Sequence, residues 1–142
     1  MPTLTENASV IYTAKAHSTG GRDGGASRTS DGRLDVKFSI PGGPGNGTNP
    51  EQLFAAGWAT CFIGAMRNAA GRMKLHFPTD VAIDTEIDLC KSGEEFFIKA
   101  RHNISIPSLD RQTAEQLIQA ADKICPYSKA TRGNIEAEIN LV

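Results

Sequence analysis

The sequence has few cysteines, little net charge and no long hydrophobic run, and each shortage excludes a class of protein. Its three cysteines are an odd number and lie far apart, which argues against a framework of structural disulfides. They form no CxxC pair and keep no metal-ligand spacing with the three histidines, so we expect no metal site. The net charge is -1 at pH 7 without a run of Lys or Arg, which gives a nucleic-acid or anionic-membrane partner no support.

The hydrophobic residues are spread along the chain rather than gathered in one segment. The longest uncharged apolar stretch, residues 53–66, is too short to span a bilayer. Residues 1–10 lack the basic start and apolar stretch of a secretory signal, so we expect a cytoplasmic protein. With 142 residues, 39% hydrophobic and 22% charged, the chain has the size and composition of one soluble domain, residues 1–142.

Alternating hydrophobic residues predict four strands and a weaker fifth. The weaker run covers residues 10–16, and the four clear runs cover residues 34–40, 81–89, 96–106 and 135–141. The short segment 91–94, which contains Gly93, joins two of these runs as a hairpin. This part of the sheet should therefore be antiparallel.

Two helices are predicted between these strands. The first should begin after Asn49, a good N-cap residue, with Pro50 at the first helical position, and it should stop at Gly71. The second should span residues 110–124, where apolar side chains recur on one face, and Pro126 should end it. The order β-β-α-β-β-α-β predicts an α+β fold: antiparallel sheets with two main helices.

Most of the 14 glycines lie between residues 20 and 47, in two clusters. Neither cluster has the spacing of a P-loop or of a dinucleotide-binding motif. The second, residues 42–47, is interpreted as a flexible loop. The first, residues 20–25, places Arg22 in a flexible backbone that is suited to closing over a site.

The three cysteines differ in where the predicted elements place them. Cys61 lies three turns inside the first helix, beyond the reach of its N-terminal dipole. Since residues 53–66 are apolar nearly all round, burial would make Cys61 an inert core thiol unless a cation reaches it. Cys125 ends the second helix, where carbonyl dipoles disfavour a thiolate, so it is better suited to being attacked than to attacking. Cys90, at a strand end, is interpreted as a small buried or edge residue.

Two stretches resemble the cysteine motifs of the organic hydroperoxide resistance proteins, which belong to the superfamily of osmotically inducible protein C. They read Asn49-Pro-Glu-Gln-Leu-Phe-Ala-Ala-Gly-Trp-Ala-Thr-Cys61-Phe and Cys125-Pro-Tyr-Ser-Lys-Ala-Thr-Arg-Gly-Asn134. Residues 12–14 and 20–24 are similar to the N-terminal segment of that family. The resemblance spans nearly the whole chain in the expected order. Trp58 and Thr60 stand where other residues are more usual.

The resemblance implies roles for individual residues. Cys61 matches the peroxidatic cysteine and Cys125 the resolving cysteine. Arg22 and Glu51 match a charged pair that holds the site in its reactive form. The resemblance also implies an intertwined homodimer with two active sites at the subunit interface, no cofactor, and a lipoylated protein as the dithiol reductant. A second subunit would also cover the flank of the apolar helix that one small sheet leaves open.

The implied activity is that of a thiol-dependent peroxidase. The Cys61 thiolate would attack an organic hydroperoxide, release an alcohol and keep the second oxygen as a sulfenic acid. Condensation with Cys125 would give a disulfide, and a dithiol would reduce it. Two alternatives stay open: a general thiol-disulfide transferase, and a non-catalytic stress-induced protein that binds small apolar ligands.

The neighbours of Cys61 along its helix lead to two further expectations. Four apolar residues recur at four-residue spacing on one face, partly as core and partly as the wall of a substrate pocket: Phe54, Trp58, Phe62 and Met66. Glu51 precedes Cys61 by ten residues, and roughly 15 Å of helix rise separates them. A glutamate cannot bridge that distance along a straight helix, so we expect Glu51 to reach Arg22 beside Cys61 from the other subunit.

Overall fold

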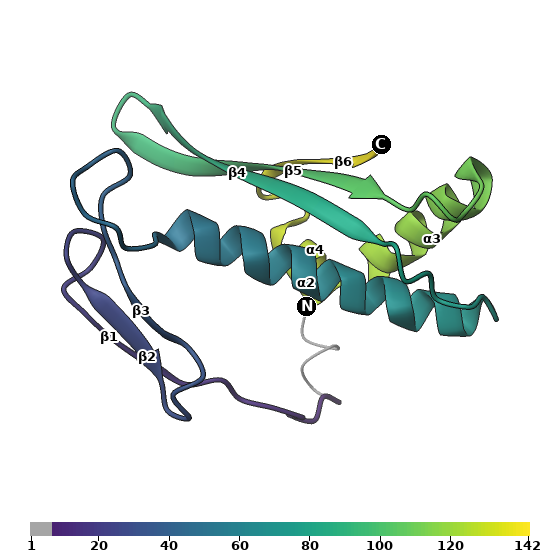
Figure 1. Ribbon diagram of the computed structural model, residues 1–142, viewed down its shortest axis with the longest axis horizontal. Helices are drawn as coiled ribbons and strands as arrows, with labels where there is room; N and C mark the ends of the chain where they lie inside the picture. Colours follow the sequence, from purple (N-terminus) through teal and green to yellow (C-terminus); the bar gives the residue numbers. More distant parts are fainter. Residues whose placement is uncertain (1–6) are drawn as a thin grey trace. The chain divides into compact units, whose positions relative to one another are not determined.

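The structure is a computed structural model and describes residues 7–142. These residues form two units. The first unit ends at Asn49, and the second is Pro50–Val142. Figure 1 shows their elements, which are in chain order β1 Ala16–Thr19, β2 Ala26–Thr29, β3 Asp35–Lys37, α2 Pro50–Arg72, β4 Ala82–Ser92, β5 Glu95–Ser105, α3 Arg111–Ile124, α4 Pro126–Thr131 and β6 Glu136–Leu141.

The glycine cluster at residues 20–25 builds the tight turn between β1 and β2. Positive φ angles at Gly21 and Gly24, 69° and 80°, are conformations that glycine adopts without strain. Gly25 is buried so closely against the backbone of Gly21 that there is no room for a side chain. The N–H of Gly24 donates to the carbonyl of Phe38, 3.1 Å away, and the N–H of Phe38 donates to Gly25, 2.9 Å away. The expected flexible loop is thus a defined turn tied to the chain beyond β3.

The three strands of the first unit form an antiparallel sheet in the order β1-β2-β3. The strand expected at residues 10–16 begins only at Ala16, because β1 is positioned by its pairing with β2 across the glycine turn. Strand β2 was not predicted, since its sequence Ala-Ser-Arg-Thr has no apolar alternation and it is held by backbone bonds to both neighbours. The run at 34–40 is strand only at its centre, in β3.

The second unit contains a mixed sheet in the order β4-β5-β6. Strands β4 and β5 form the predicted antiparallel hairpin, which turns at Gly93, where φ is 61°. Strand β6 pairs with β5 in parallel, however, so the sheet is not wholly antiparallel. The reason is the connection: α3 and α4 carry the chain back to the end of the sheet from which β5 starts, as a parallel pair requires. The α+β class is confirmed.

Helix α2 starts at Pro50, as predicted, but it continues through Gly71. Its end lies at Lys74, whose φ of 56° is left-handed. The N–H of Leu75 donates to Ala70 over 2.8 Å, and that of Lys74 donates to Gly71 over 3.2 Å, which is the hydrogen-bond pattern of a Schellman motif. Lysine therefore occupies the position that was expected for Gly71. No helix within residues 7–142 is long and apolar enough to cross a membrane.

Two helices, α3 and α4, follow one another around Cys125. Helix α3 begins after Asp110, whose carboxylate accepts the N–H of Thr113 at 3.1 Å, a cap worth about 1 kcal/mol. Pro126 ends α3 as predicted, but it also starts α4, because proline lacks the N–H that a first helical position does not need. This second role of Pro126 was not predicted from the sequence.

Helix α2 runs along one face of the β4–β5–β6 sheet (Figure 1) and supplies much of the core. Trp58, Phe62 and Met66 are almost fully buried there, together with Ile104 of β5 and Leu117 of α3.

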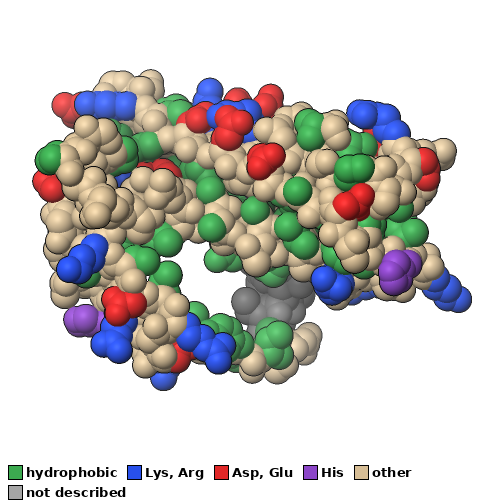
Figure 2. Space-filling model, in the orientation of Figure 1, with side chains coloured by type: hydrophobic (Ala, Val, Ile, Leu, Met, Phe, Trp, Pro, Cys, Tyr) green, Lys and Arg blue, Asp and Glu red, His purple; other side chains and the backbone are tan. Residues whose placement is uncertain are grey.

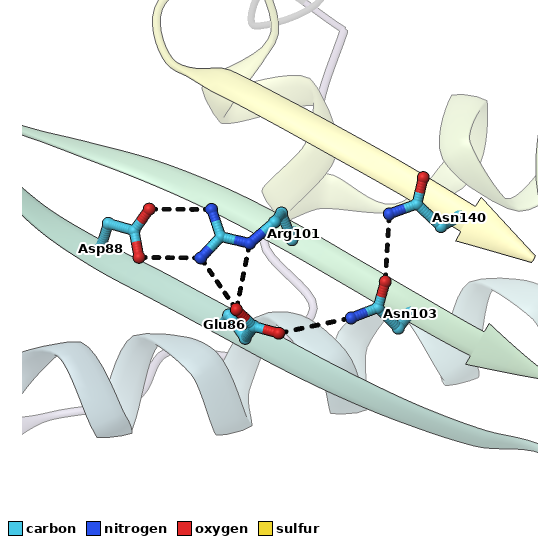
Figure 3. Close-up of polar contacts among 5 residues, drawn as sticks. All are labelled: Glu86, Asp88, Arg101, Asn103 and Asn140. Atoms are coloured by element: carbon cyan, nitrogen blue, oxygen red, sulfur yellow. Dashed lines mark hydrogen bonds and ion pairs between the residues drawn. The ribbon is translucent and has the colours of Figure 1, made fainter. Parts of the chain in front are cut away.

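The other face of this sheet is polar. Figure 2 shows acidic and basic side chains gathered over the sheet along the top of the view. In Figure 3, Arg101 of β5 donates to both carboxylate oxygens of Asp88 at 2.8 Å and to Glu86 at 2.9 and 3.1 Å. Asn103 joins Glu86 to Asn140 of β6, so side chains from all three strands are connected. This alternation leaves the face toward α2 to apolar residues.

We predict that Gly71→Ala raises the free energy of unfolding by roughly 0.5–1 kcal/mol. Gly71 lies inside α2, and a Cβ there would meet nothing within 4 Å. The matched control is Gly93→Ala, where space is equally open but the positive φ should make alanine cost about 1–2 kcal/mol. Urea unfolding at one fixed protein concentration measures both. If both variants lost stability alike, Gly71 rather than Lys74 would end α2.

Candidate functional site

Cys61 and Cys125 lie side by side in the second unit. The thiol of Cys125 donates to the sulfur of Cys61, and the two sulfur atoms are 3.4 Å apart. A disulfide bond is about 2.05 Å long, so the pair is reduced and about 1.4 Å short of bonding distance. Cys61 is partly exposed, whereas Cys125 is fully buried. An external reagent therefore meets Cys61 first.

The position of Cys125 follows from the break between two helices. It is the C-cap of α3, with its N–H donating to Ala121 at 2.9 Å, and it is also the N-cap of α4. Its φ and ψ of -60° and 120° are extended, which interrupts the helical backbone between α3 and α4. Cys125 therefore lies at the carbonyl end of one helix, as predicted, and at the N–H end of another.

Opposing effects act on the ionisation of Cys61. Burial raises the pKa of the Cys61 thiol, and the adjacent Cys125 raises it further. The backbone N–H of Tyr127, in the first turn of α4, lowers this pKa because it stabilises a thiolate. Burial has the larger effect, which matches the expectation for a thiol inside an apolar helix. A nearby cation is the usual means of lowering such a pKa.

The predicted charged pair is divided between the two units. Arg22 is exposed in the turn between β1 and β2 of the first unit. Glu51 is half-buried in the first turn of α2, in the second unit. Helix α2 is continuous from Glu51 to Cys61, so roughly 15 Å of helix rise does separate them. Their roles beside Cys61, and the intertwined homodimer, stay predictions.

Three of the four apolar residues predicted beside Cys61 belong to the core. Trp58, Phe62 and Met66 are at most 2% exposed. Their stripe faces the sheet, where the Trp58 and Phe62 rings lie 4.4 and 6.0 Å from the ring of His102. Phe54 is only partly buried, and it lines a cavity of about 650 Å³.

Five of the nine residues that line the cavity at Phe54 are aromatic or aliphatic, and four are polar or charged. The Phe54 ring also contacts the ring of Tyr127, with centroids 6.2 Å apart. Tyr127 also supplies the N–H near Cys61, but neither Tyr127 nor either cysteine of the pair lines the cavity. The other lining residues are Phe96, Phe97, Ile98, Lys99, Thr131, Asn134, Ile135 and Glu136.

Three further residues on or beside the packed face of α2 were not predicted from the sequence. Tyr127 contacts Cys61 through its backbone, which no side-chain pattern indicates. Ser128 is buried and accepts a hydrogen bond from the Trp58 indole at 3.2 Å. His102 is fully buried, bonded through Nδ1 to Thr85 at 2.8 Å, and burial lowers its pKa so that the ring is neutral at pH 7. Its place in the alternating run at 96–106 was the one signal of burial.

The donors that a metal would need are not gathered in one place. Within residues 7–142, no group of three or more His, Cys, Asp or Glu side chains could hold a metal ion.

Comparison with known proteins decides the family. Residues 43–140 match the family model described as OsmC-like protein. The chain belongs to this family. It is 46% identical over 136 residues to an organic hydroperoxide resistance protein of Xanthomonas axonopodis pv. citri, covering 93% of this chain and 95% of that protein. The resemblance read from the two cysteine motifs is thereby confirmed.

Solved structures of OsmC-like proteins share this fold. The organic hydroperoxide resistance protein OhrB of Bacillus subtilis superposes with a TM-score of 0.87 at 38% identity, covering 94% of this chain and all of that one. A putative organic hydroperoxide resistance protein of Vibrio cholerae, with captopril bound in one of its active sites, gives a TM-score of 0.87 at 34% identity over 95% and 94% of the two chains.

We predict that a mild oxidant such as diamide links Cys61 to Cys125 within one chain and leaves Cys90 as a thiol. The first two sulfurs are already in contact, while Cys90 lies on β4, paired with Phe97 of β5. Alkylation of the remaining thiols followed by peptide mass spectrometry identifies the link. Cys125→Ser is the control and should give no link within the chain. A disulfide that includes Cys90 would contradict this assignment of the pair.

Proposed function

We propose that this chain is a cytoplasmic thiol peroxidase that reduces organic hydroperoxides to alcohols without a cofactor. The observation that carries the proposal is the 3.4 Å contact between Cys61 and Cys125. It is supported by the names of the relatives, since the chain is 46% and 39% identical to organic hydroperoxide resistance proteins of Xanthomonas axonopodis pv. citri and Bacillus subtilis.

In the first step the Cys61 thiolate attacks one peroxide oxygen. The O–O bond breaks, the alkoxide takes a proton and leaves as an alcohol, and Cys61 is oxidised to a sulfenic acid. Cys61 suits this role because it is the accessible thiol of the pair. The backbone N–H of Tyr127, which lowers the pKa of Cys61, favours the thiolate form that attacks.

In the second step Cys125 attacks the oxidised sulfur of Cys61. An S–S bond forms, the S–O bond breaks, and the oxygen leaves as water. The two sulfurs need to approach by about 1.4 Å, which a cysteine between two helices can supply. This step protects Cys61 from a second oxidation to the irreversible sulfinic acid.

In the third step an external dithiol, which we propose is a lipoylated protein, reduces the disulfide by exchange. One thiolate attacks a sulfur of the pair, and the second thiol of the reductant resolves the mixed disulfide. Both electrons of the cycle thus come from the dithiol and reach the peroxide through Cys61.

A charged pair completes the proposed site. Burial raises the pKa of Cys61, so the attack needs a cation beside it, and Arg22 is the candidate that the family resemblance implies. Glu51 would hold Arg22 in place. Because roughly 15 Å of continuous helix separates Glu51 from Cys61, we propose that Glu51 acts on the cysteine of a partner subunit in a homodimer.

The cavity beside Phe54 supports an organic substrate. A buried alkyl or aryl group gains roughly 25 cal/mol per Å² of apolar surface, and the walls offer Phe54, Phe96 and Phe97. Hydrogen peroxide has no such group. The proposed peroxidase should therefore turn over an aryl hydroperoxide more efficiently than hydrogen peroxide.

An assay with dihydrolipoamide tests the proposed function through the cysteines. Cys61→Ser should abolish peroxide consumption, because a hydroxyl is a weak nucleophile and cannot form a sulfenic acid. Cys125→Ser should react once and then accumulate sulfinic acid, visible by mass spectrometry. Cys90→Ser is the control and should keep its activity. Dithiol-dependent turnover by Cys61→Ser would contradict this mechanism.

The same assay separates the alternatives. Disulfide exchange with glutathione or protein disulfides, without peroxide turnover, would identify a thiol-disulfide transferase. Neither activity would leave a binding protein whose cysteines are incidental. Equal efficiency with an aryl hydroperoxide and with hydrogen peroxide would count against the apolar pocket at Phe54.

Subunit mixing tests the place of Glu51. Glu51→Ala and Cys61→Ser homodimers should each be inactive, since each lacks one required residue in both sites. A mixture that exchanges subunits should regain activity, because one site of each heterodimer then holds both native residues. Cys125→Ser mixed with Cys61→Ser is the control and should regain none, as the two cysteines share a chain. Failure of the first mixture to recover, despite exchange, would place Glu51 and Cys61 in one chain.

A further inference from the structure

Two neighbouring side-chain contacts join helix α2 to the start of α4. Nε1 of Trp58 donates to Oγ of Ser128 at 3.2 Å, and the thiol of Cys125 donates to Cys61 at 3.4 Å. In each helix the two partners are three residues apart, close to one helical turn. The hydrogen bond and the thiol pair therefore fix the same stretch of α4 against the same stretch of α2.

The Trp58–Ser128 hydrogen bond is enclosed by the protein. Trp58 is 2% exposed and Ser128 is 4% exposed, so water cannot easily replace either partner. The indole is also held by its neighbours: its ring stacks on Phe54 at 5.4 Å and meets the edge of His102 at 4.4 Å. A donor fixed in this way specifies where the hydroxyl of Ser128 has to lie.

Two contacts hold α4 to α3: the N–H of Cys125 donates to Ala121, and Arg132 at the far end of α4 donates to Asp122. Cys125 is the N-cap of α4, but no side chain caps the helix there. Helix α4 has six residues, too short to be stable by itself. Tyr127 adds an aromatic contact, since its ring lies against α2 at Gly57, where a Cβ would come within 3.4 Å of it.

We propose that Trp58 and Ser128 are positioning residues for the disulfide step: their hydrogen bond holds Cys125 within reach of the Cys61 sulfur. Neither side chain reacts. The inference rests on the proposed function only in naming the oxidised form of Cys61 as a sulfenic acid. The positioning itself applies to any attack of Cys125 on an activated Cys61 sulfur.

The attack of Cys125 can be observed without peroxide. In a Cys90→Ser background, the disulfide dithiobis-nitrobenzoate, whose released thiolate is yellow, reacts first with the accessible Cys61. One thionitrobenzoate group stays bonded to the Cys61 sulfur as a mixed disulfide, and the other is released as a thiolate. Cys125 then attacks the Cys61 sulfur, the mixed disulfide breaks, and the second nitrobenzoate thiolate leaves. The second release is first-order and measures how often Cys125 reaches Cys61.

Loss of the hydrogen bond should slow the second release. The net free energy of a typical hydrogen bond corresponds to a factor of roughly two to ten in a rate or equilibrium constant. We expect Ser128→Ala to lower the first-order rate constant of the second release by that factor. Trp58→Phe, which keeps a ring but removes the N–H, should have a similar effect. The double variant should be no slower than the slower single variant, because the link is already broken in each.

Lys129→Ala is the matched control within α4. Its side chain is exposed in the last turn of α4, and the variant keeps the backbone bond from its N–H to the carbonyl of Cys125 at 3.0 Å. The second release should stay within about twofold of the native rate. Thermal unfolding of every variant, followed by circular dichroism, confirms that it is folded under the assay conditions. If Ser128→Ala and Trp58→Phe released the second thiolate at the native rate, or if their effects were additive, the positioning role would be refuted.

The outcomes separate this inference from the proposed function. If the native protein releases two thiolates and the variants release the second one more slowly, the positioning role is supported. This holds even if the chain consumes no peroxide with a dithiol. Native protein that releases only one thiolate would overturn both, since Cys125 would not reach Cys61. Peroxide turnover with unaffected variants would keep the peroxidase and overturn the positioning role.

Discussion

The middle of α2 has to be buried on several sides, and the second unit is arranged around that constraint. Residues 53–66 offer almost no polar surface, so the sheet and α3 pack against them. Trp58, Phe62 and Met66 fill the space under β5. Cys61 belongs to the same stretch, and its position is therefore fixed by core packing. A nucleophile built into a core helix has a more defined geometry than one on a loop.

The burial that fixes Cys61 also opposes its ionisation. A free thiol is only a few per cent thiolate at neutral pH, and burial raises the pKa of Cys61 further. The N–H of Tyr127 acts in the opposite direction, and it is available because α4 begins immediately after Cys125. The proposed roles of Arg22 and Glu51 address the same problem, since a cation beside Cys61 would also stabilise the thiolate.

Regular patterns were predictable from the sequence, and features set by tertiary contacts were not. The hairpin of β4 and β5 and the two long helices follow from alternation, helical spacing and the signals at Pro50 and Pro126. Strand β2 has no apolar pattern, and the parallel pairing of β6 depends on the path of the connection. The left-handed Lys74 shows that the packing of a helix end can override the preference for glycine. Spacing alone also could not pair Cys61 with Cys125, which are 64 residues apart, and that pairing was indicated by the family motifs.

Cys125 caps two helices at once, so its backbone is held differently from that of Cys61. Cys61 lies inside a continuous helix, where any shift of its backbone would strain the hydrogen-bonded turns on both sides. Cys125 belongs to neither helix interior, and its extended backbone lies between the last turn of α3 and the first turn of α4. Its N–H donates to Ala121 of α3 and its carbonyl accepts the N–H of Lys129, so one backbone bond ties it to each helix. The proposed step from thiol pair to disulfide would therefore depend on the fit of this one junction, because neither helix interior carries the Cys125 sulfur.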